Sequence, residues 1–201
     1  MIELPKEIYI SRKSPTPAGA RYLYNWLNDN GEKYGLKNGK CLEFSAGITS
    51  WAVAFALYPS REVIIECERY ANIVNFKSLA GEDYFKNVEF YHTWKEIPND
   101  VYDVVLIDGS TGAPPELSKK STINRKEAIE YSEQFHREGT IVVIHDMFNP
   151  SPAYVRSIDY LKNCGKYTLI DSFKQPRKGF GIFQRDEVIR ECGLCMNSIG
   201  V

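Results

Sequence analysis

Acidic side chains stand at the ends of three short apolar runs in this chain. Glu43 lies in the run Cys-Leu-Glu-Phe, Glu66 ends Val-Ile-Ile-Glu, and Asp108 follows Val-Val-Leu-Ile. Carboxylates accept hydrogen bonds from paired hydroxyl groups, attract cations and take up protons. In an open α/β sheet, ligands bind in the crevice at the carboxyl ends of the parallel strands. The three acids therefore predict a ligand site as well as a fold.

The loop after Glu43 has the wrong glycine pattern for a dinucleotide. Glu66 follows Gly47 by 19 residues (66 − 47), close to the spacing at which an acid meets a cofactor ribose. However, Ser45 and Ile48 break the GxGxxG pattern, and Glu43 would repel a pyrophosphate. A cationic adenosine ligand without phosphate suits the loop better. S-adenosylmethionine (SAM), which carries a sulfonium and an ammonium group, is such a ligand.

A second group of polar residues could act on an acceptor. Asp108 ends the fourth expected strand, and His145 and Asp146 end the fifth. Methyl transfer to an alcohol requires a base or a metal ion to remove the proton, and His145 is a suitable base by its intrinsic pKa. Asp108 and Asp146 could hold a divalent cation. Two structural roles remain open, because Asp-Gly is a common turn dipeptide and Asp146 could cap the next helix.

Strand-like and helix-like stretches alternate along the chain, which is typical of a parallel sheet covered by helices. Strands are expected at 40–44, 62–66, 87–91, 102–107, 140–145, 167–172 and 180–184. Helices are expected at 17–30, 49–58, 69–80, 124–138 and 152–163. The gap between the last two strands is too short for a helical crossover, so this pair should be antiparallel. We therefore expect an α/β fold with a doubly wound, mostly parallel sheet of seven strands, a C-terminal antiparallel hairpin strand and helices on both faces.

Composition and charge predict one ordinary globular domain over 1–201. It would comprise the N-terminal helix 17–30, a core at 40–185 and a tail at 186–201. The net charge of −1 provides no general attraction for nucleic acid or an anionic membrane, so such binding would need a local patch. The longest apolar run is too short to span a bilayer, and the first ten residues lack the features of a secretory signal. A cytoplasmic location is the default expectation.

Five cysteines form a poor framework for disulfides because their number is odd and they are scattered. Cys192 and Cys195 form a single CxxC motif near the C-terminus. A zinc site needs about four ligands, and the three histidines are distant in sequence. A reduced, inert pair is favoured over a metal site, and no metal is expected.

Three segments resemble successive motifs of the class I SAM-dependent methyltransferases. They are Glu43-Phe-Ser-Ala-Gly-Ile-Thr-Ser50, Ile64-Ile-Glu-Cys-Glu68 and Tyr102-Asp-Val-Val-Leu-Ile-Asp-Gly109. The resemblance covers about residues 40–185 and implies SAM as cofactor. It places Ser45 and Gly47 beside Glu43 at the methionine part of SAM, and Glu66 at the ribose hydroxyls. The first motif departs from the family's E-x-G-x-G at Ser45.

The same resemblance places the adenine near His92 and Trp94, just after the third strand. Trp94 could stack on the adenine and His92 could form a hydrogen bond to it. A tryptophan that covers the core beside a loop is an equally good interpretation. In catechol-type methyltransferases the second aspartate is followed by asparagine, whereas Met147 follows Asp146 here. This departure disfavours a catechol-type metal site.

A long segment from Ser110 to Asn124 leads to Arg125 and has the length of a functional lid. Arg125 could hold an anionic acceptor through paired hydrogen bonds. Lys119 and Lys120 could assist, although a solvated surface run is favoured for them. Ile-Asp-Gly-Ser-Thr-Gly, a later arginine and Ile-His-Asp also resemble, over about 102–161, the glucuronoxylan O-methyltransferases that act on polysaccharides.

The sequence thus predicts a SAM-dependent methyltransferase acting on oxygen of a small-molecule or carbohydrate-like acceptor. Two alternatives stay open. Ser45 and Met147 motivate a catalytically silent relative that binds a partner through this fold. A nucleic-acid methyltransferase is disfavoured by the near-neutral charge and by the lack of an Asn/Asp-Pro-Pro-aromatic motif after the fourth strand.

Overall fold

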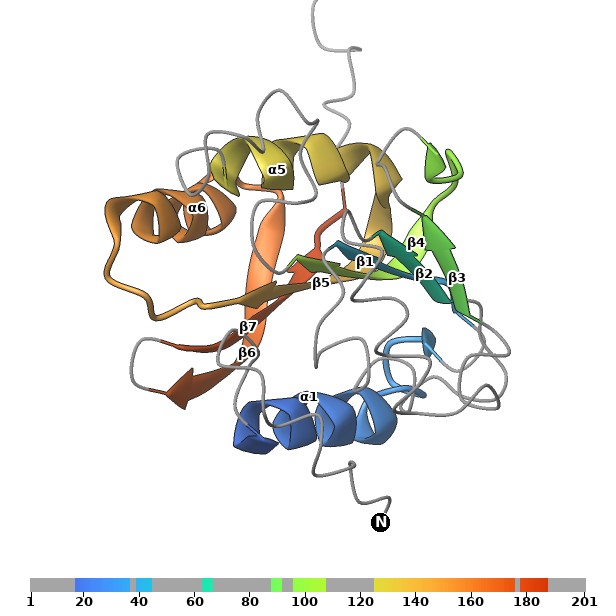
Figure 1. Ribbon diagram of the computed structural model, residues 1–201, viewed down its shortest axis with the longest axis horizontal. Helices are drawn as coiled ribbons and strands as arrows, with labels where there is room; N and C mark the ends of the chain where they lie inside the picture. The colour runs from blue at the N-terminus through green and yellow to red at the C-terminus, as the bar shows by residue number, and fades with distance from the viewer. Residues whose placement is uncertain are drawn as a thin grey trace, which may run out of the picture.

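Seven strands form a single sheet in the computed structural model, in the order β3-β2-β1-β4-β5-β7-β6 (Figure 1). The structure describes residues 17–36, 39–44, 63–66, 88–91, 96–107, 125–175 and 178–187. The strands are β1 (Cys41–Phe44), β2 (Val63–Glu66), β3 (Val88–Tyr91), β4 (Tyr102–Ile107), β5 (His136–His145), β6 (Tyr167–Gln175) and β7 (Lys178–Arg185).

Strand direction reverses only at β7. The pairs β1–β2, β1–β4, β2–β3 and β4–β5 are parallel, whereas β7 is antiparallel to both β5 and β6. The expectation of a mostly parallel sheet that ends in an antiparallel hairpin is confirmed. Because β6 runs in the same direction as β5, the end of β6 lies at the same edge of the sheet as the end of β5.

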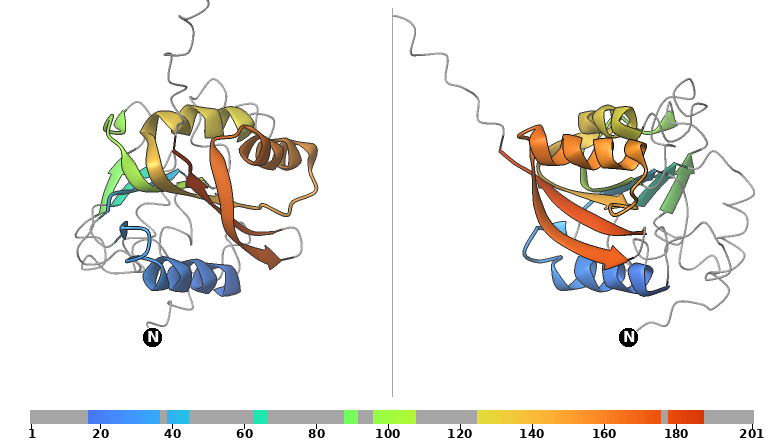
Figure 2. Two further views of the ribbon diagram at one scale, coloured as in Figure 1. Left: turned by 180° about the vertical axis from the view of Figure 1, so that it is seen from behind. Right: turned by 90° about the vertical axis from the view of Figure 1, so that its left-hand side faces the viewer.

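Described helices cover both faces of the sheet (Figures 1 and 2). Helix α1 (Pro17–Asp29) lies on one face, and α5 (Arg125–Ser132) and α6 (Pro152–Asn163) lie on the other. Side chains of successive strand residues point to opposite faces. Leu106 of β4 therefore joins the core under α1, whereas Val105 joins the core under α5 and α6. Burial on both faces explains the continuous apolar runs of the central strands.

The first and last predicted helices agree with the structure to within one residue. Leu23 and Leu27 of α1 are fully buried, as their helical spacing predicts. Helix α6 occupies 152–163 and begins with Pro152, whose fixed φ suits a first helical turn. Ser151 occupies its N-cap position, so Asp146 does not cap this helix. No helix in the described ranges is long and apolar enough to cross a membrane.

The predicted helix 124–138 was too long. Helix α5 ends at Ser132, a 3₁₀ turn follows at Glu133–Phe135, and β5 begins at His136, four residues before its predicted start. Gly139 has a φ of +80°, which a helix cannot accommodate. The Thr140 hydroxyl donates to the Tyr102 carbonyl at 2.8 Å and accepts the Arg137 N–H at 2.9 Å. Pairing with β4 therefore overrides the helix-forming residues of this segment.

The terminal hairpin is longer than predicted. Strand β6 extends to Gln175 and β7 begins at Lys178, whereas the sequence placed their ends at 172 and 180. Gly179 pairs with Lys174 and has a φ of +109°, a conformation that favours glycine. The predicted helices 49–58 and 69–80 lie outside the described residues.

A buried polar network joins five elements at the amino edge of the sheet. His136 Nδ1 lies 2.8 Å from the Tyr167 hydroxyl, which accepts a hydrogen bond from Arg185 at 2.8 Å. Glu133 accepts hydrogen bonds from the Tyr160 hydroxyl at 2.7 Å and from Lys166 at 2.5 Å. His136 is 9% exposed, and burial, with a smaller contribution from Arg185, lowers its pKa from 6.5 to about 3.

We expect this histidine to make the domain sensitive to acid. Between pH 6.5 and about 3 the unfolded chain binds a proton at His136 that the folded chain does not. Unfolding therefore becomes easier as the pH falls through this window, by up to about 1.4 kcal/mol for each pH unit. Urea unfolding of His136→Asn should show a shallower loss of stability from pH 6.5 to 4.

The matched control is Tyr167→Phe, which removes the hydroxyl partner but keeps the titrating histidine. It should lower stability at pH 8 and retain the loss of stability in acid. A slope in His136→Asn equal to that of the unmodified chain would show that His136 does not control this pH dependence.

Candidate functional site

The register of the central strands aligns their carboxyl ends. Phe44 of β1 pairs with Glu66 of β2 on one side and with Ile107 of β4 on the other. Ile107 in turn pairs with Ile144 of β5. The carboxyl ends of these four strands therefore lie along one edge of the sheet, where α/β folds bind their ligands.

Glu43 is a fully buried acid one residue before that edge. It pairs with Ile65 of β2 and Leu106 of β4, so its strand neighbours are apolar. Moving a carboxylate out of water is costly, and groups of opposite charge or hydrogen-bond donors offset that cost. Such a residue suits a site that receives a cationic group.

The ends of β2 and β3 extend the site to one side. Glu66, the last residue of β2, pairs with Phe44 of β1 and with Tyr91 of β3. Tyr91 is half-buried, and its hydroxyl donates to the exposed Glu89 at 2.7 Å. The alignment places Glu66 of β2 level with the end of β1. Its predicted contact with a ribose stays a prediction.

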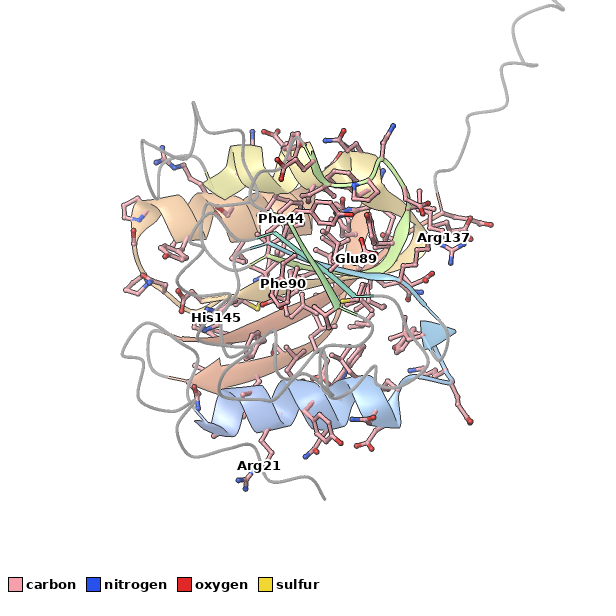
Figure 3. The ribbon with its side chains drawn as sticks, turned by 45° about the vertical axis from the view of Figure 1, so that its right-hand side comes forward. Arg21, Phe44, Glu89, Phe90, Arg137 and His145 are labelled. Atoms are coloured by element: carbon pink, nitrogen blue, oxygen red, sulfur yellow. The ribbon has the colours of Figure 1, made fainter. Side chains whose placement is uncertain are left out.

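His145 lies on the other side of the site, at the end of β5. Figure 3 shows it at the opposite end of the sheet from Arg137, which is near the start of the same strand. His145 is 2% exposed, and its ring lies against Phe180 with centroids 5.0 Å apart and planes tilted by 38°. Its Nε2 is 3.5 Å from Asp146 Oδ1. The strand and the phenylalanine together fix the imidazole at this edge.

Asp146 has the most unusual backbone conformation of the described residues. Its φ is +58°, and no other described non-glycine residue has a positive φ. Aspartate tolerates this left-handed conformation better than most residues. Its side chain is 18% exposed, against 2% for His145, so the carboxylate is the more accessible group of the pair. Backbone strain of this kind is found most often at functional sites.

The structure describes only part of the predicted site, and the contact that it gives between predicted site residues joins His145 and Asp146. Glu43, His145 and Asp146 are described in full, whereas Glu66 and Arg125 are described as the last residue of β2 and the first of α5. The other predicted site residues lie outside the described ranges: Ser45, Gly47, His92, Trp94 and Asp108. Their roles stay predictions.

Met147 is a core residue. It is 8% exposed and belongs to the apolar core under α5 and α6. The structure describes no group of three or more histidine, cysteine, aspartate or glutamate residues that could hold a metal ion. Within the described ranges, the residue that follows His145 and Asp146 is thus the buried Met147, whose thioether packs in the core, and no further oxygen ligand for a metal ion accompanies the pair.

Sequence reasoning missed the part that β7 plays in the site. Phe180 supports the His145 ring, and Gly179 accepts a hydrogen bond from the Met147 N–H at 3.3 Å. The available signal was the Gly-Phe-Gly segment 179–181, because glycine inside a strand often marks a close approach of other atoms.

Comparison with known proteins identifies the fold. No protein-family model matches the sequence, and no curated protein matches it. Among solved structures, the O-methyltransferase from Bacillus cereus in complex with SAH has a TM-score of 0.65 at 13% identity, over 88% of this chain and 84% of that one. The chain has the class I methyltransferase fold.

Two further structures share this methyltransferase fold. The O-methyltransferase TomG from Streptomyces achromogenes, in complex with SAM, has a TM-score of 0.64 at 15% identity over 90% of this chain and 86% of that one. A precorrin-6y C5,15-methyltransferase from Geobacter metallireducens has a TM-score of 0.63 at 12% identity over 92% and 98%. Identities this low establish the fold alone.

The left-handed conformation of Asp146 predicts a specific order of stability. Asp146→Asn should unfold at nearly the same urea concentration as the unmodified chain, because asparagine also tolerates a positive φ. Asp146→Ala should lose about 1 kcal/mol more, since a Cβ without a local hydrogen-bonding group is strained there. Equal stability of the alanine and asparagine variants would contradict the left-handed turn.

Proposed function

We propose that this chain is a SAM-dependent methyltransferase. The observation that carries the proposal is the buried carboxylate of Glu43 at the carboxyl edge of a sheet with the methyltransferase fold. Charge complementarity favours a cationic cofactor at this position and disfavours a pyrophosphate. The Bacillus cereus and Streptomyces neighbours, which were solved with SAH and SAM, support the same choice.

We assign each part of SAM to residues at this edge or next to it in the sequence. Glu43 would attract the ammonium group of the methionine part, near Ser45 and Gly47. Glu66, which pairs with Phe44 at the end of β1, would accept hydrogen bonds from the ribose hydroxyls. We assign His92 and Trp94 to the adenine because they directly follow β3, the strand next to β2.

On the acceptor side, we assign proton removal to His145 and Asp146, with Asp108 beside them. When bound, SAM supplies an electrophilic methyl group. The more accessible Asp146 would face the acceptor hydroxyl, and His145 would share the proton across the Nε2–Oδ1 contact of 3.5 Å. Ile107, the last residue of β4, pairs with Ile144, the residue before His145. We therefore assign Asp108, which follows Ile107 in the sequence, to the same side of the site.

The acceptor class we propose is a small molecule with a hydroxyl group. A base at the end of β5 suits an alcohol or phenol, whose oxygen must lose its proton. We assign Arg125, the first residue of α5, to the binding of an anionic group on the acceptor. We also propose that residues 1–201 form a single domain.

Cofactor binding is tested by calorimetric titration with SAH. We expect saturable binding to the unmodified chain and a loss of about tenfold or more in Glu43→Gln, which keeps the shape but removes the charge. Glu66→Ala should weaken binding as well. Glu138→Gln, an exposed substitution near the start of β5, is the matched control and should bind normally. An unmodified chain that gives no binding heat would refute the proposal.

Catalysis is tested with tritium-labelled SAM and a small-molecule extract as the source of acceptors. We expect label in the small-molecule fraction, and we expect His145→Gln to reduce transfer by at least about 100-fold while SAH binding persists. SAH binding without transfer by the unmodified chain would instead favour the catalytically silent alternative. Transfer of label to added RNA or DNA in place of small molecules would replace the proposed acceptor class.

A further inference from the structure

The turn that carries Asp146 is attached to β7. The Met147 N–H donates to the Gly179 carbonyl at 3.3 Å, and the Asn149 N–H donates to the Asp146 carbonyl at 3.0 Å. One hydrogen bond thus closes the turn, and the other connects it to the neighbouring strand. The left-handed Asp146 lies between these two constraints, directly after His145.

Gly181 makes room for the side chain of Met147. A Cβ at position 181 would collide with Met147 Sδ and would lie 2.9 Å from Phe183 Cε2. Gly181 pairs with Ile144, the second-last residue of β5, so it lies beside the end of that strand. Because Met147 is nearly fully buried, its thioether cannot move into solvent without losing core contacts.

Gly179 makes a second close contact with the same turn. Its φ of +109° favours glycine, and a Cβ there would collide with the Phe173 carbonyl oxygen and lie 3.0 Å from Phe148 Cδ2. Phe148 follows Met147 in the turn. Because positions 179 and 181 carry no side chain, two successive residues of the turn, Met147 and Phe148, can pack against β7.

Between these glycines, Phe180 supports His145. The two residues pair across β5 and β7, and their rings are in contact. Phe180 is fully buried, so its ring is held by the core. Three consecutive residues of β7 thus contact the segment from His145 to Phe148. A shift of β7 relative to β5 would therefore move both His145 and the turn that contains Asp146.

We propose that Gly181 is a positioning residue for the His145–Asp146 pair, acting through Met147. This inference rests on the proposed function for its catalytic consequence, but its structural part concerns only the geometry of the pair, which the His145 ring reports through its contact with Asp146. A side chain at 181 displaces the thioether of Met147. Because this thioether is buried, we infer that Met147 shifts as a whole and moves Asp146, the adjacent residue. Misplacing a reacting group by about 1 Å can cost up to 100-fold in rate, so a small shift has a large effect.

Gly181→Ala tests the proposal, and Gly39→Ala is its matched control. A Cβ at Gly39 would also meet a side chain, lying 2.6 Å from Asp103 Oδ2, but at the amino edge of the sheet. Both variants should therefore lower the melting temperature. The distinguishing measurement is the NMR signal of the His145 imidazole in ¹H–¹³C spectra. The chain has three histidines, and His145→Gln assigns the signal.

We expect Gly181→Ala to shift the His145 signal and to reduce methyl transfer about tenfold to 100-fold, with SAH affinity within about twofold of the unmodified chain. Gly39→Ala should change neither the signal nor transfer per folded molecule. A normal His145 signal in Gly181→Ala, or the same shift in both variants, would overturn the proposal. If the unmodified chain transfers no methyl group, the proposed function fails, and the His145 signal still decides the positioning role.

Met147→Ala provides an independent test should Gly181→Ala fail to fold. It removes the thioether without a collision and should also shift the His145 signal. Where both single variants fold, the effects of the two substitutions should be non-additive in the double variant Met147→Ala/Gly181→Ala, because they act through one contact. Additive effects would show that Gly181 acts by some route other than Met147.

Discussion

The parallel pairing of β1, β4 and β5 sets the level at which their carboxyl ends stop. Phe44, Ile107 and Ile144 lie in one row, so the carboxyl ends of β1, β4 and β5 lie at one edge of the sheet. A slip of one residue would turn every side chain of a strand to the opposite face. Glu43 would then point to the face that Phe44 now occupies, and the acid would lie in the apolar core under α5 and α6. Strand register thus controls both the core and the composition of the site.

The two edges of the sheet use charge differently. At the amino edge, Asp103 pairs with Arg137 and accepts the Lys40 N–H, so its carboxylate holds strands together. At the carboxyl edge, Glu43 is fully buried and Asp146 occupies a left-handed conformation. A left-handed backbone at a non-glycine residue costs stability, and both features occur where α/β folds bind ligands. Charged side chains at the amino edge thus stabilise the sheet, whereas those at the carboxyl edge suit a ligand site.

Pattern alone was sufficient for the sheet, because buried parallel strands leave long apolar runs and short connections limit the topology. It was insufficient near His136, where pairing with Tyr102 begins β5 inside a segment rich in helix formers. The acid at Glu43 and the pair at the end of β5 could be found from strand ends. The contribution of Gly181 could not, because it depends on a neighbour brought close by the antiparallel return of β7.

A crystal structure of the complex with SAH would test the central claim most directly. We expect SAH at the carboxyl edge of β1, β2 and β4, with its ammonium group near Glu43 and its ribose hydroxyls bonded to Glu66. We also expect the sulfur to face the side of the site that carries His145 and Asp146. SAH bound at the amino edge, or in contact with neither Glu43 nor Glu66, would show that these acids do not form the cofactor site.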